Sequence, residues 1–321
     1  MERKFCVAPM MDRTDRHERY FLRTLSQEML LYTEMLHANA VLHGNQEELL
    51  KYNAIEHPLA IQLGGSDPGL LKEASSVAES KGFDEINLNV GCPSPRVQSG
   101  QFGAILMKNA PLVAQCIKAI KNTVSIPVTV KCRIGVDEMD EKKDLDSFVG
   151  CVKESGCNTF IVHARKAWLK GLSPKDNREI PPLNYERVYR LKDTFPDLEF
   201  ILNGGINNIT DSLGHLKYVD GVMLGRSAYD NPYGLIEVDE LIYNKPKKLE
   251  SRSQVLEGFL PYLKIENDRG SKLGHMTKHL MGLFKGTVYA KKARTLLASI
   301  DSHERPIESI QSLIKEIKIA C

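Results

Sequence analysis

The sequence lacks the features that define membrane-embedded and exported proteins. It contains no run of about 18 consecutive apolar residues, the length that a membrane-spanning helix needs. Its first residues, MERKFCVAPM, are charged and include no apolar stretch of signal-peptide length. We therefore expect a globular protein that resides in the cytoplasm.

Cysteine is present, but the spacing of the cysteines matches neither a disulfide framework nor a metal site. The seven cysteines are an odd number, are widely scattered and include no CxxC pair. Disulfide scaffolds and zinc sites both depend on paired or closely spaced cysteines. The sequence therefore predicts no metal and agrees with a reducing compartment.

Excess charge of one sign is also lacking, because the formal net charge is only +2. This argues against a uniformly basic nucleic-acid-binding protein. The charge is uneven, however: from Lys245 to the end there are 15 basic residues and only 8 acidic ones. Such asymmetry hints at an anionic partner for this segment, although a solvated helical surface explains it equally well.

Short β-branched runs recur along the chain, and helical patterns separate most of them. The runs cover residues 5–10, 30–35, 59–65, 85–92, 128–135, 159–165, 199–205 and 221–227. Eight such strand–helix units are typical of a (β/α)8 TIM barrel. A doubly wound sheet is the alternative, but the GxGxxG expected after its first strand is missing, since the sequence there reads APMMDRTD.

After Asn244 the character of the sequence changes. A polar, basic linker leads into segments with helical periodicity and no convincing strand. We therefore divide the chain into a barrel domain of residues 1–244 and a helical domain of residues 245–321. Three or four amphipathic helices are expected in this second part, over residues 255–266, 275–286, 289–300 and 306–319.

Five polar residues are expected to point into the barrel. Strand side chains alternate between two faces, and in each of these strands the apolar face suits the surrounding helices. The inward residues are Gln62, Asn89, Lys131, His163 and Asn203. A lone Asn or His inside a core is usually just hydrogen-bonded, but a buried lysine without a partner is rare and costly. Because they lie towards the C-terminal ends of their strands, they predict a functional site.

Two glycine-containing strand ends sharpen this prediction. The seventh strand finishes in Asn203-Gly204-Gly205, and the eighth in Gly225-Arg226. Barrels of this type frequently hold a phosphate group at these two loops, through backbone N–H groups. The guanidinium of Arg226 would add a charge-assisted contact.

Flavin mononucleotide (FMN) fits these requirements. Lys131 would stabilise negative charge on the reduced ring, while Gln62 and His163 would bond its carbonyl groups and ring nitrogens. Pro9 and Met10, at the end of the first strand, would lie against the flat ring.

The stretch EINLNVGCPSP, residues 85–95, places Cys92 just beyond the fourth strand. A free cysteine is often a small buried hydrophobe. A thiol at a strand end near a site can instead be a nucleophile or a proton donor. Because Asn87 and Asn89 share the interior face predicted for Lys131, we favour a thiol at the open end of the barrel.

In combination, these motifs resemble the tRNA-dihydrouridine synthases, which are FMN-dependent barrels with a C-terminal helical domain. The matching stretches are APMMDRTD (8–15), LYTEM (31–35), QLGGSDP (62–68), INLNVGCPSP (86–95), VKCRIG (130–135), VHAR (162–165), NGGI (203–206) and DGVMLGR (220–226). GLSPKDNREIPPL (171–183) is similar to the DusA branch. The resemblance covers essentially the whole chain.

The resemblance implies reduction of a uridine C5=C6 bond in the D-loop of tRNA, near position 20, after NADPH has reduced the flavin. Hydride passes from flavin N5 to uracil C6, and a cysteine thiol protonates C5. By motif match the cysteine is Cys92, and Asn89 contacts the target nucleotide. The implied flavin contacts are Pro9, Met10, Gln62, Lys131, His163, Asn203, Gly204, Gly205, Gly225 and Arg226.

A tRNA substrate also needs an electropositive surface, because phosphate contacts set the affinity and its salt dependence. Basic residues follow the sixth strand and recur in the tail, and most of them are expected to be simply solvated. The contacts that we favour are Lys175, Arg178, Lys291 and Arg294. No protein partner is implied, and we expect a monomer.

Two other functions share part of this pattern. An FMN barrel dehydrogenase that reduces a small enone or a free pyrimidine would use the same flavin residues, but it does not explain the basic tail. A non-catalytic RNA-binding protein that kept the barrel would need neither Cys92 nor a flavin.

Overall fold

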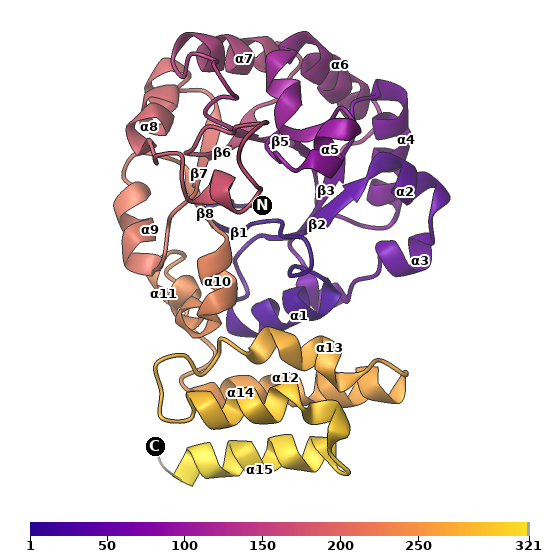
Figure 1. Ribbon diagram of the computed structural model, residues 1–321, viewed down its shortest axis with the longest axis vertical. Helices are drawn as coiled ribbons and strands as arrows, with labels where there is room; N and C mark the ends of the chain where they lie inside the picture. Colours follow the sequence, from indigo (N-terminus) through magenta and orange to yellow (C-terminus); the bar gives the residue numbers. More distant parts are fainter. Residues whose placement is uncertain (320–321) are drawn as a thin grey trace.

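The protein forms a barrel of parallel strands, with a group of helices packed against one side of it (Figure 1). The computed structural model describes residues 1–319. The strands are β1 (Phe5–Val7), β2 (Leu31–His37), β3 (Leu59–Gly64), β4 (Glu85–Asn89), β5 (Val128–Arg133), β6 (Thr159–His163), β7 (Glu199–Asn203) and β8 (Gly221–Leu224). They pair in the order β1-β8-β7-β6-β5-β4-β3-β2, and a parallel bridge between Cys6 and Leu30 links β1 to the start of β2. The (β/α)8 prediction is confirmed.

Most strands are shorter than the runs that predicted them, and the difference lies at their C-terminal ends. The fourth strand, predicted over 85–92, ends at Asn89, and the eighth, predicted over 221–227, ends at Leu224. The remaining residues of these runs form loops, or in the eighth run the start of the next helix, at the C-terminal end of the barrel, which we call the mouth. Active sites of TIM barrels lie at this end.

Helices surround the barrel and connect its strands (Figure 1). They are α1 (Arg16–Leu25), α2 (Ala38–His43), α3 (Gln46–Leu49), α4 (Pro68–Ser80), α5 (Pro95–Ser99), α6 (Ala110–Lys121), α7 (Lys143–Lys153), α8 (Tyr185–Thr194), α9 (Ile209–His215), α10 (Arg226–Asp230) and α11 (Val238–Leu241). Local capping explains several starts. Asp67 accepts a hydrogen bond from Leu70 N at the start of α4, and Asn208 accepts one from Asp211 N at the start of α9.

Alternation along the strands divides the apolar core into two layers. Side chains such as Val130, Phe160 and Leu202 belong to the large outer cluster between strands and helices. A smaller cluster fills part of the interior: Cys6, Ala8, Leu30, Tyr32, Ala60, Ile161, Ile201 and Met223. Ile161 and Ile201 lie on the same strand faces as His163 and Asn203, so the prediction that these faces of the sixth and seventh strands point into the barrel is confirmed.

The N-terminal end of the barrel interior, which we call the floor, holds a buried ionic network. Arg3 Nε donates to Glu85 Oε2 at 2.7 Å, and Arg3 Nη1 donates to Glu199 Oε2 at 2.8 Å. The Tyr32 hydroxyl donates to Glu85 at 2.9 Å, and the Thr159 hydroxyl donates to Glu199 at 2.7 Å. Each carboxylate therefore has both a cation and a hydroxyl donor, and for the fully buried Glu85 these contacts offset the desolvation.

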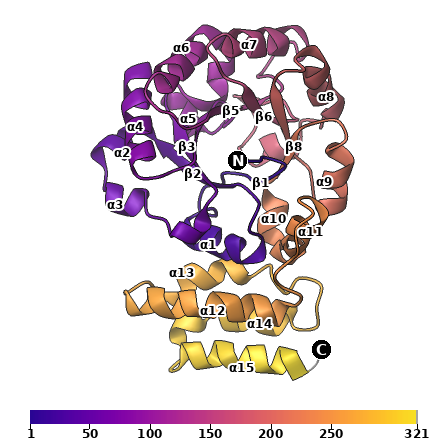
Figure 2. The same ribbon diagram turned by 180° about the vertical axis from the view of Figure 1, so that it is seen from behind.

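The tail after the barrel is helical within the described residues. It contains α12 (Arg252–Asp268), α13 (Leu273–Thr277), α14 (Ala290–Ala298) and α15 (Pro306–Ile319). Seen from behind, these helices stack against one side of the barrel, with α12 and α13 next to α1 (Figure 2). The helix expected over 275–286 forms only the end of α13, a 3-10 turn over 278–280 and further turns.

Two glycines explain why this predicted helix is interrupted. Gly286, the last residue of the predicted helix, has a φ of +79° and therefore ends any helical segment there. Gly282 packs directly on the end of α10, where a Cβ would lie 2.8 Å from the carbonyl oxygens of Tyr229 and Asp230. The helix is therefore interrupted where the backbone at Gly282 packs closely against the end of α10.

The interface between barrel and tail has a buried charge cluster around His279. Its Nε2 lies 3.0 Å from Asp15 Oδ1, and its Nδ1 lies 3.2 Å from Glu18 Oε2. Lys278 also pairs with Asp15, at 3.0 Å. Burial lowers the pKa of His279, but the hydrogen bond to Asp15 and the charge of the nearby Glu18 carboxylate outweigh this and raise the pKa above its usual value.

Candidate active site

Cys92 lies at the mouth, on the loop between β4 and α5, and is half-buried. Asn89, the last residue of β4, holds this loop: its Oδ1 accepts from Gly91 N at 3.2 Å and from Cys92 N at 3.0 Å. On the other side, Ala104 N donates to the Cys92 carbonyl at 2.9 Å. The thiol lies 3.6 Å from Ser94 Oγ. The backbone of Cys92 is therefore fixed while its thiol remains partly accessible.

Gln62 and Asn89 were both predicted to point into the barrel, and their side chains are hydrogen-bonded to each other there. Asn89 Nδ2 donates to Gln62 Oε1 at 2.8 Å, and Gln62 Nε2 donates to Asn87 Oδ1 at 2.8 Å. Both polar atoms of Asn89 are thus engaged within the protein. A contact between Asn89 and a nucleotide would have to use its second N–H hydrogen.

Lys131 is a cation with little compensation. Its Nζ donates to Asn203 Oδ1 at 3.0 Å, and Asn203 Nδ2 donates to the Met223 carbonyl at 2.7 Å. Lys131 pairs with no carboxylate in residues 1–319. Burial, together with the nearby Arg133 guanidinium, lowers the pKa of Lys131 to about 8. An anion placed beside Lys131 would restore the missing interaction.

His163, at the end of β6, carries an unpaired polar atom. Its buried Nδ1 has no hydrogen-bond partner among the described residues. Burial, followed by the Arg133 and Lys131 charges, lowers the pKa of His163 well below its usual value, so the imidazole is neutral. Buried polar atoms without a partner are rare in native proteins and require an explanation. A bound ligand would provide one.

The glycines after β7 form a narrow backbone cradle. Gly204 and Gly205 have φ values of +109° and +69°, which side chains rarely adopt. A Cβ on Gly204 would lie 3.2 Å from the His163 ring, and one on Gly205 would lie 2.7 Å from the Tyr185 hydroxyl. That hydroxyl donates to the Gly204 carbonyl at 2.9 Å. Gly225 completes the cradle between β8 and α10.

Arg226 is exposed and already has a partner, because its Nη1 donates to Glu179 Oε1 at 2.5 Å. The sequence alone does not indicate that Glu179 is the partner of Arg226. Arg165 is one of the basic residues that follow the sixth strand, and its Nε is buried and unpaired within residues 1–319. Arg165 is therefore a further candidate for an anion contact at the mouth.

Pro9 and Met10 follow β1 and are half-buried at the mouth. Ala8 N donates to the Leu224 carbonyl at 2.8 Å, which keeps this segment beside β8. Met10 N donates to Thr14 Oγ1 at 3.0 Å, and its side chain packs against the inner apolar cluster. An apolar surface thus borders the polar residues of the mouth.

Arg133 is a structural residue of the mouth whose role sequence analysis missed. Its Nε donates to the Gly91 carbonyl at 3.1 Å, and its Nη1 donates to the Asn177 carbonyl at 2.8 Å. It therefore braces the Cys92 loop against the loop after β6. The sequence feature that could have revealed it is its position two residues after Lys131, which places both side chains on the same face of the strand.

The predicted tRNA contacts are exposed but lie in two separate places. One pair is on the loop between β6 and α8, and the other is on α14: Lys175, Arg178, Lys291 and Arg294. Two other basic residues of the tail are already paired. Lys292 forms an ion pair with Glu316, and Lys278 pairs with Asp15 in the interface.

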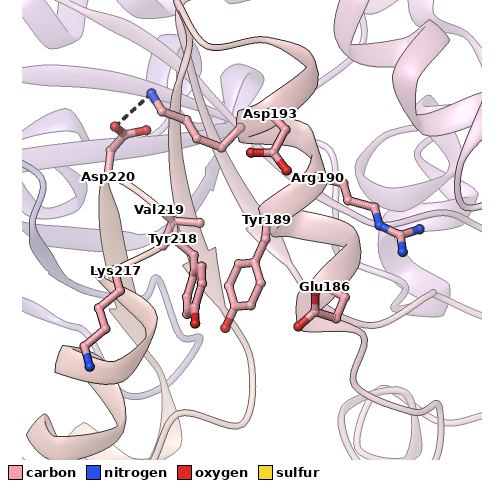
Figure 3. Close-up of a pocket in the computed structure, with 9 residues that line it drawn as sticks. Glu186, Tyr189, Arg190, Asp193, Lys217, Tyr218, Val219 and Asp220 are labelled. Atoms are coloured by element: carbon pink, nitrogen blue, oxygen red, sulfur yellow. Dashed lines mark ion pairs between the residues drawn. The ribbon is translucent and has the colours of Figure 1, made fainter.

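A surface hollow lies far from Cys92, between α8 and the segment that precedes β8 (Figure 3). The rings of Tyr189 and Tyr218 stack there with centroids 4.6 Å apart, and Lys192 pairs with Asp220 at 2.9 Å. Residues 1–319 contain no cluster of three or more His, Cys, Asp or Glu residues suited to a metal ion. No helix in that range has the length and apolarity needed to span a membrane.

Comparisons with known proteins agree with the motifs. Residues 6–318 match the family model described as dihydrouridine synthase (Dus). Three relatives named tRNA-dihydrouridine(20/20a) synthase are similar to this chain. The protein of Shewanella oneidensis is 52% identical over 93% of this chain and 89% of its own. That of Synechocystis sp. is 54% identical, covering 91% and 90%. That of Escherichia coli K12 is 53% identical, covering 92% and 86%.

A solved structure of 2-naphthoyl-CoA reductase with 2-naphthoyl-CoA shares the fold, with a TM-score of 0.56 at 10% identity. It covers 76% of this chain, and the match spans 50% of that chain. The match of the family model over nearly the whole chain, together with identities above 50%, establishes the relationship. The chain belongs to the dihydrouridine synthase family.

Proposed function

We propose that this protein reduces the C5=C6 bond of a uridine in the D-loop of tRNA, at position 20 or 20a, with bound FMN and with NADPH as the reductant. The observation that carries this proposal is the arrangement at the mouth. A partly accessible thiol, Cys92, lies beside an interior that holds the uncompensated Lys131 and the unpaired His163 Nδ1. The names of the three relatives support the choice of tRNA and of the position.

The residues of the mouth fit FMN in charge and shape. FMN, when bound, supplies the hydride. Lys131 would stabilise negative charge on the ring, Gln62 and His163 would hydrogen-bond it, and Asn203 would orient Lys131. Apolar contact with the ring would come from Pro9 and Met10. The phosphate would lie on Gly204, Gly205 and Gly225, with Arg226 and Arg165 supplying charge.

Cys92 would deliver the proton. Reduction adds a hydride at C6 and a proton at C5 of uracil, and the thiol of Cys92 is the donor on the mouth loop. Asn89 holds the backbone of Cys92, and its free N–H hydrogen is available to the target base. A single-stranded loop is the natural place for such a substrate, because its bases leave their stack at low energetic cost.

The tail and the loop after β6 would bind the rest of the tRNA. Lys175 and Arg178 lie at the mouth, and Lys291 and Arg294 lie on α14. Contacts of this kind bind phosphates and set the salt dependence rather than the choice of uridine. We further propose that the protein acts as a monomer in the cytoplasm, where tRNA is modified.

The test uses the full-length protein and tRNA from cells that lack it. The purified protein should show flavin absorption, and NADPH should bleach it. Mapping of dihydrouridine should then show a new modification at position 20 or 20a. A protein that binds no flavin would contradict the proposal, and so would one that reduces free uridine but leaves tRNA unchanged.

A further inference from the structure

A continuous series of hydrogen bonds leads from the Cys92 loop into the barrel. Cys92 N donates to Asn89 Oδ1 at 3.0 Å, and Asn89 Nδ2 donates to Gln62 Oε1 at 2.8 Å. Gln62 Nε2 then donates to Asn87 Oδ1, again at 2.8 Å. All three side chains lie on β3 or β4, and Gln62 and Asn87 are direct neighbours in the strand register.

The series continues from Asn87 to the barrel floor. Asn87 Nδ2 donates to Thr129 Oγ1 at 2.8 Å, and Thr129 Oγ1 donates to Glu85 Oε1 at 2.6 Å. Glu85 is fully buried and is held by Arg3 and Tyr32. The thiol loop at one end of the barrel is thus connected to the ionic network at the other.

The chemistry of its lower end fixes the direction of every bond in this series. A threonine hydroxyl has one hydrogen, and Thr129 uses it on the Glu85 carboxylate. Asn87 must therefore turn its NH2 group towards Thr129 and its oxygen towards Gln62. By the same reasoning, Gln62 turns its oxygen towards Asn89. A reversed amide would place like groups together and leave buried polar atoms unsatisfied, which is unfavourable.

At the upper end of the series, these bond directions determine how the side-chain amide of Asn89 faces the Cys92 loop. Asn89 must direct its oxygen at the backbone N–H groups of Gly91 and Cys92, since its NH2 group is bound to Gln62. Asn87 and Thr129, which support this orientation from the other end of the series, are fully buried. They lie below Gln62 in the series and are closed off from solvent.

We propose that Asn87 and Thr129 are positioning residues for uridine reduction, which act through Gln62 and Asn89 to hold the backbone that carries the Cys92 thiol. This inference rests on the proposed role of Cys92 as the proton donor. A purely structural role for the two residues makes a different prediction, because it would lower stability without changing the chemistry of the thiol.

The test compares Thr129→Val with Thr129→Ser in the FMN-loaded enzyme. Valine keeps the shape and removes the hydroxyl, whereas serine keeps the hydroxyl and loses only a methyl group. Three quantities are measured: the rate of flavin reduction by NADPH, the rate at which tRNA lacking dihydrouridine reoxidises the reduced flavin, and the rate at which iodoacetamide alkylates Cys92. Peptide mass spectrometry separates Cys92 from Cys151, which is also half-buried and serves as an internal reference. Thr129→Ala replaces valine if that variant does not fold.

We expect Thr129→Val to slow the reoxidation by tRNA about tenfold, since small displacements of a reacting group cost this much or more. Alkylation of Cys92 should change at least threefold relative to Cys151, while reduction by NADPH stays within twofold. Thr129→Ser should restore the wild-type values. Equal behaviour of the two variants, or a loss of thermal stability alone, would overturn the inference. A wild-type enzyme that forms no dihydrouridine would instead overturn the proposed function, and the alkylation rates would still test the positioning of Cys92.

Discussion

The barrel mouth and the interface between barrel and tail each contain a histidine, but the pKa values of these two histidines are shifted in opposite directions. His163, at the mouth, lies near Arg133 and Lys131, and its pKa is lowered well below the usual value. His279, in the interface, lies between Asp15 and Glu18, and its pKa is raised. The interface places two carboxylates beside its histidine, whereas the mouth places two cations near its histidine.

This difference separates structural charge from functional charge. A compensated cluster such as Asp15, Glu18 and His279 contributes to stability and gains nothing from a ligand. An uncompensated group such as Lys131 makes the folded protein less stable than it would be without it, and only a bound anion recovers that free energy. Mutations in the two regions should therefore affect different measurements.

The largest effect should come from Cys92→Ala, which removes a proton donor from the mouth without touching any charge. We expect a loss of about a thousandfold in dihydrouridine formation, the range typical of a general acid. Flavin content, reduction by NADPH and thermal stability should stay at wild-type values. A normal yield of dihydrouridine from this variant would reject the proton-donor role of Cys92.

At the interface, Asp15→Asn should reduce stability rather than activity. Asparagine caps α1 as well as aspartate does, so the hydrogen bonds to His17 N and Glu18 N are retained. Lys278 loses its anionic partner and His279 keeps only Glu18, so we expect the free energy of unfolding to fall by about 2 kcal/mol. Urea denaturation measures this change. Unaltered stability would show that the cluster is not compensated as the distances indicate.

At the mouth, Lys131→Met should produce the reverse result. The variant should bind FMN about tenfold more weakly, because the predicted partner of the ring is gone. The flavin-free protein should be at least as stable as wild type, because an uncompensated cation has been removed. Flavin fluorescence titration and urea denaturation give the two values. A less stable flavin-free variant with unchanged FMN affinity would contradict this assignment.

The pH dependence of stability should also separate the two histidines. His163 has a lowered pKa, so the unfolded chain binds the extra proton, and stability falls as the pH drops below about 6.5. His279 has a raised pKa, so its contribution is complete below about 6.5 and is lost as the pH rises through its folded value. In the flavin-free protein, His163→Asn should flatten the acidic side of the stability profile, and His279→Asn the side above 6.5. Identical profiles for the two variants would refute the comparison.

The smallest effect concerns the surface of the tail. Replacing Lys291 and Arg294 together with Ala should weaken tRNA binding a few-fold and reduce the slope of log affinity against log salt by about two. Lys292→Ala is the matched control on the same helix, since its charge is already paired with Glu316. An equal loss from the control would mean that α14 does not contact phosphates specifically.

Much of the barrel interior could be predicted because strand parity is a local property. It placed Gln62, Asn89, Lys131 and Asn203 inside, where the structure joins them in two hydrogen-bonded pairs. The same parity applied to Glu85 and Glu199, but neither residue stands out in sequence, and only the fold brings Arg3 between them.

Other features depend on long-range contacts and were not accessible from the sequence. The pairing of Arg226 with Glu179 joins two loops that are 47 residues apart in sequence. The break in the helix expected over 275–286 follows from a backbone contact between Gly282 and α10, which no helical periodicity reveals. The alternation of side chains along a strand predicts which face of the sheet a residue is on. The partner that the residue contacts there depends on the tertiary structure.

The short helix α10 has a consequence for protein engineering. Its first residue, Arg226, stands at the cradle beside Gly225, and its last two residues meet Gly282 of the tail. Tyr229 also lies edge-on to the ring of His279, with centroids 5.8 Å apart. A chimaera that exchanges tails between relatives must therefore transfer residues 226–230 as a matched part of the graft. If the chains are joined in the linker after Asn244 instead, the foreign tail would pack against an α10 whose surface fits the original tail.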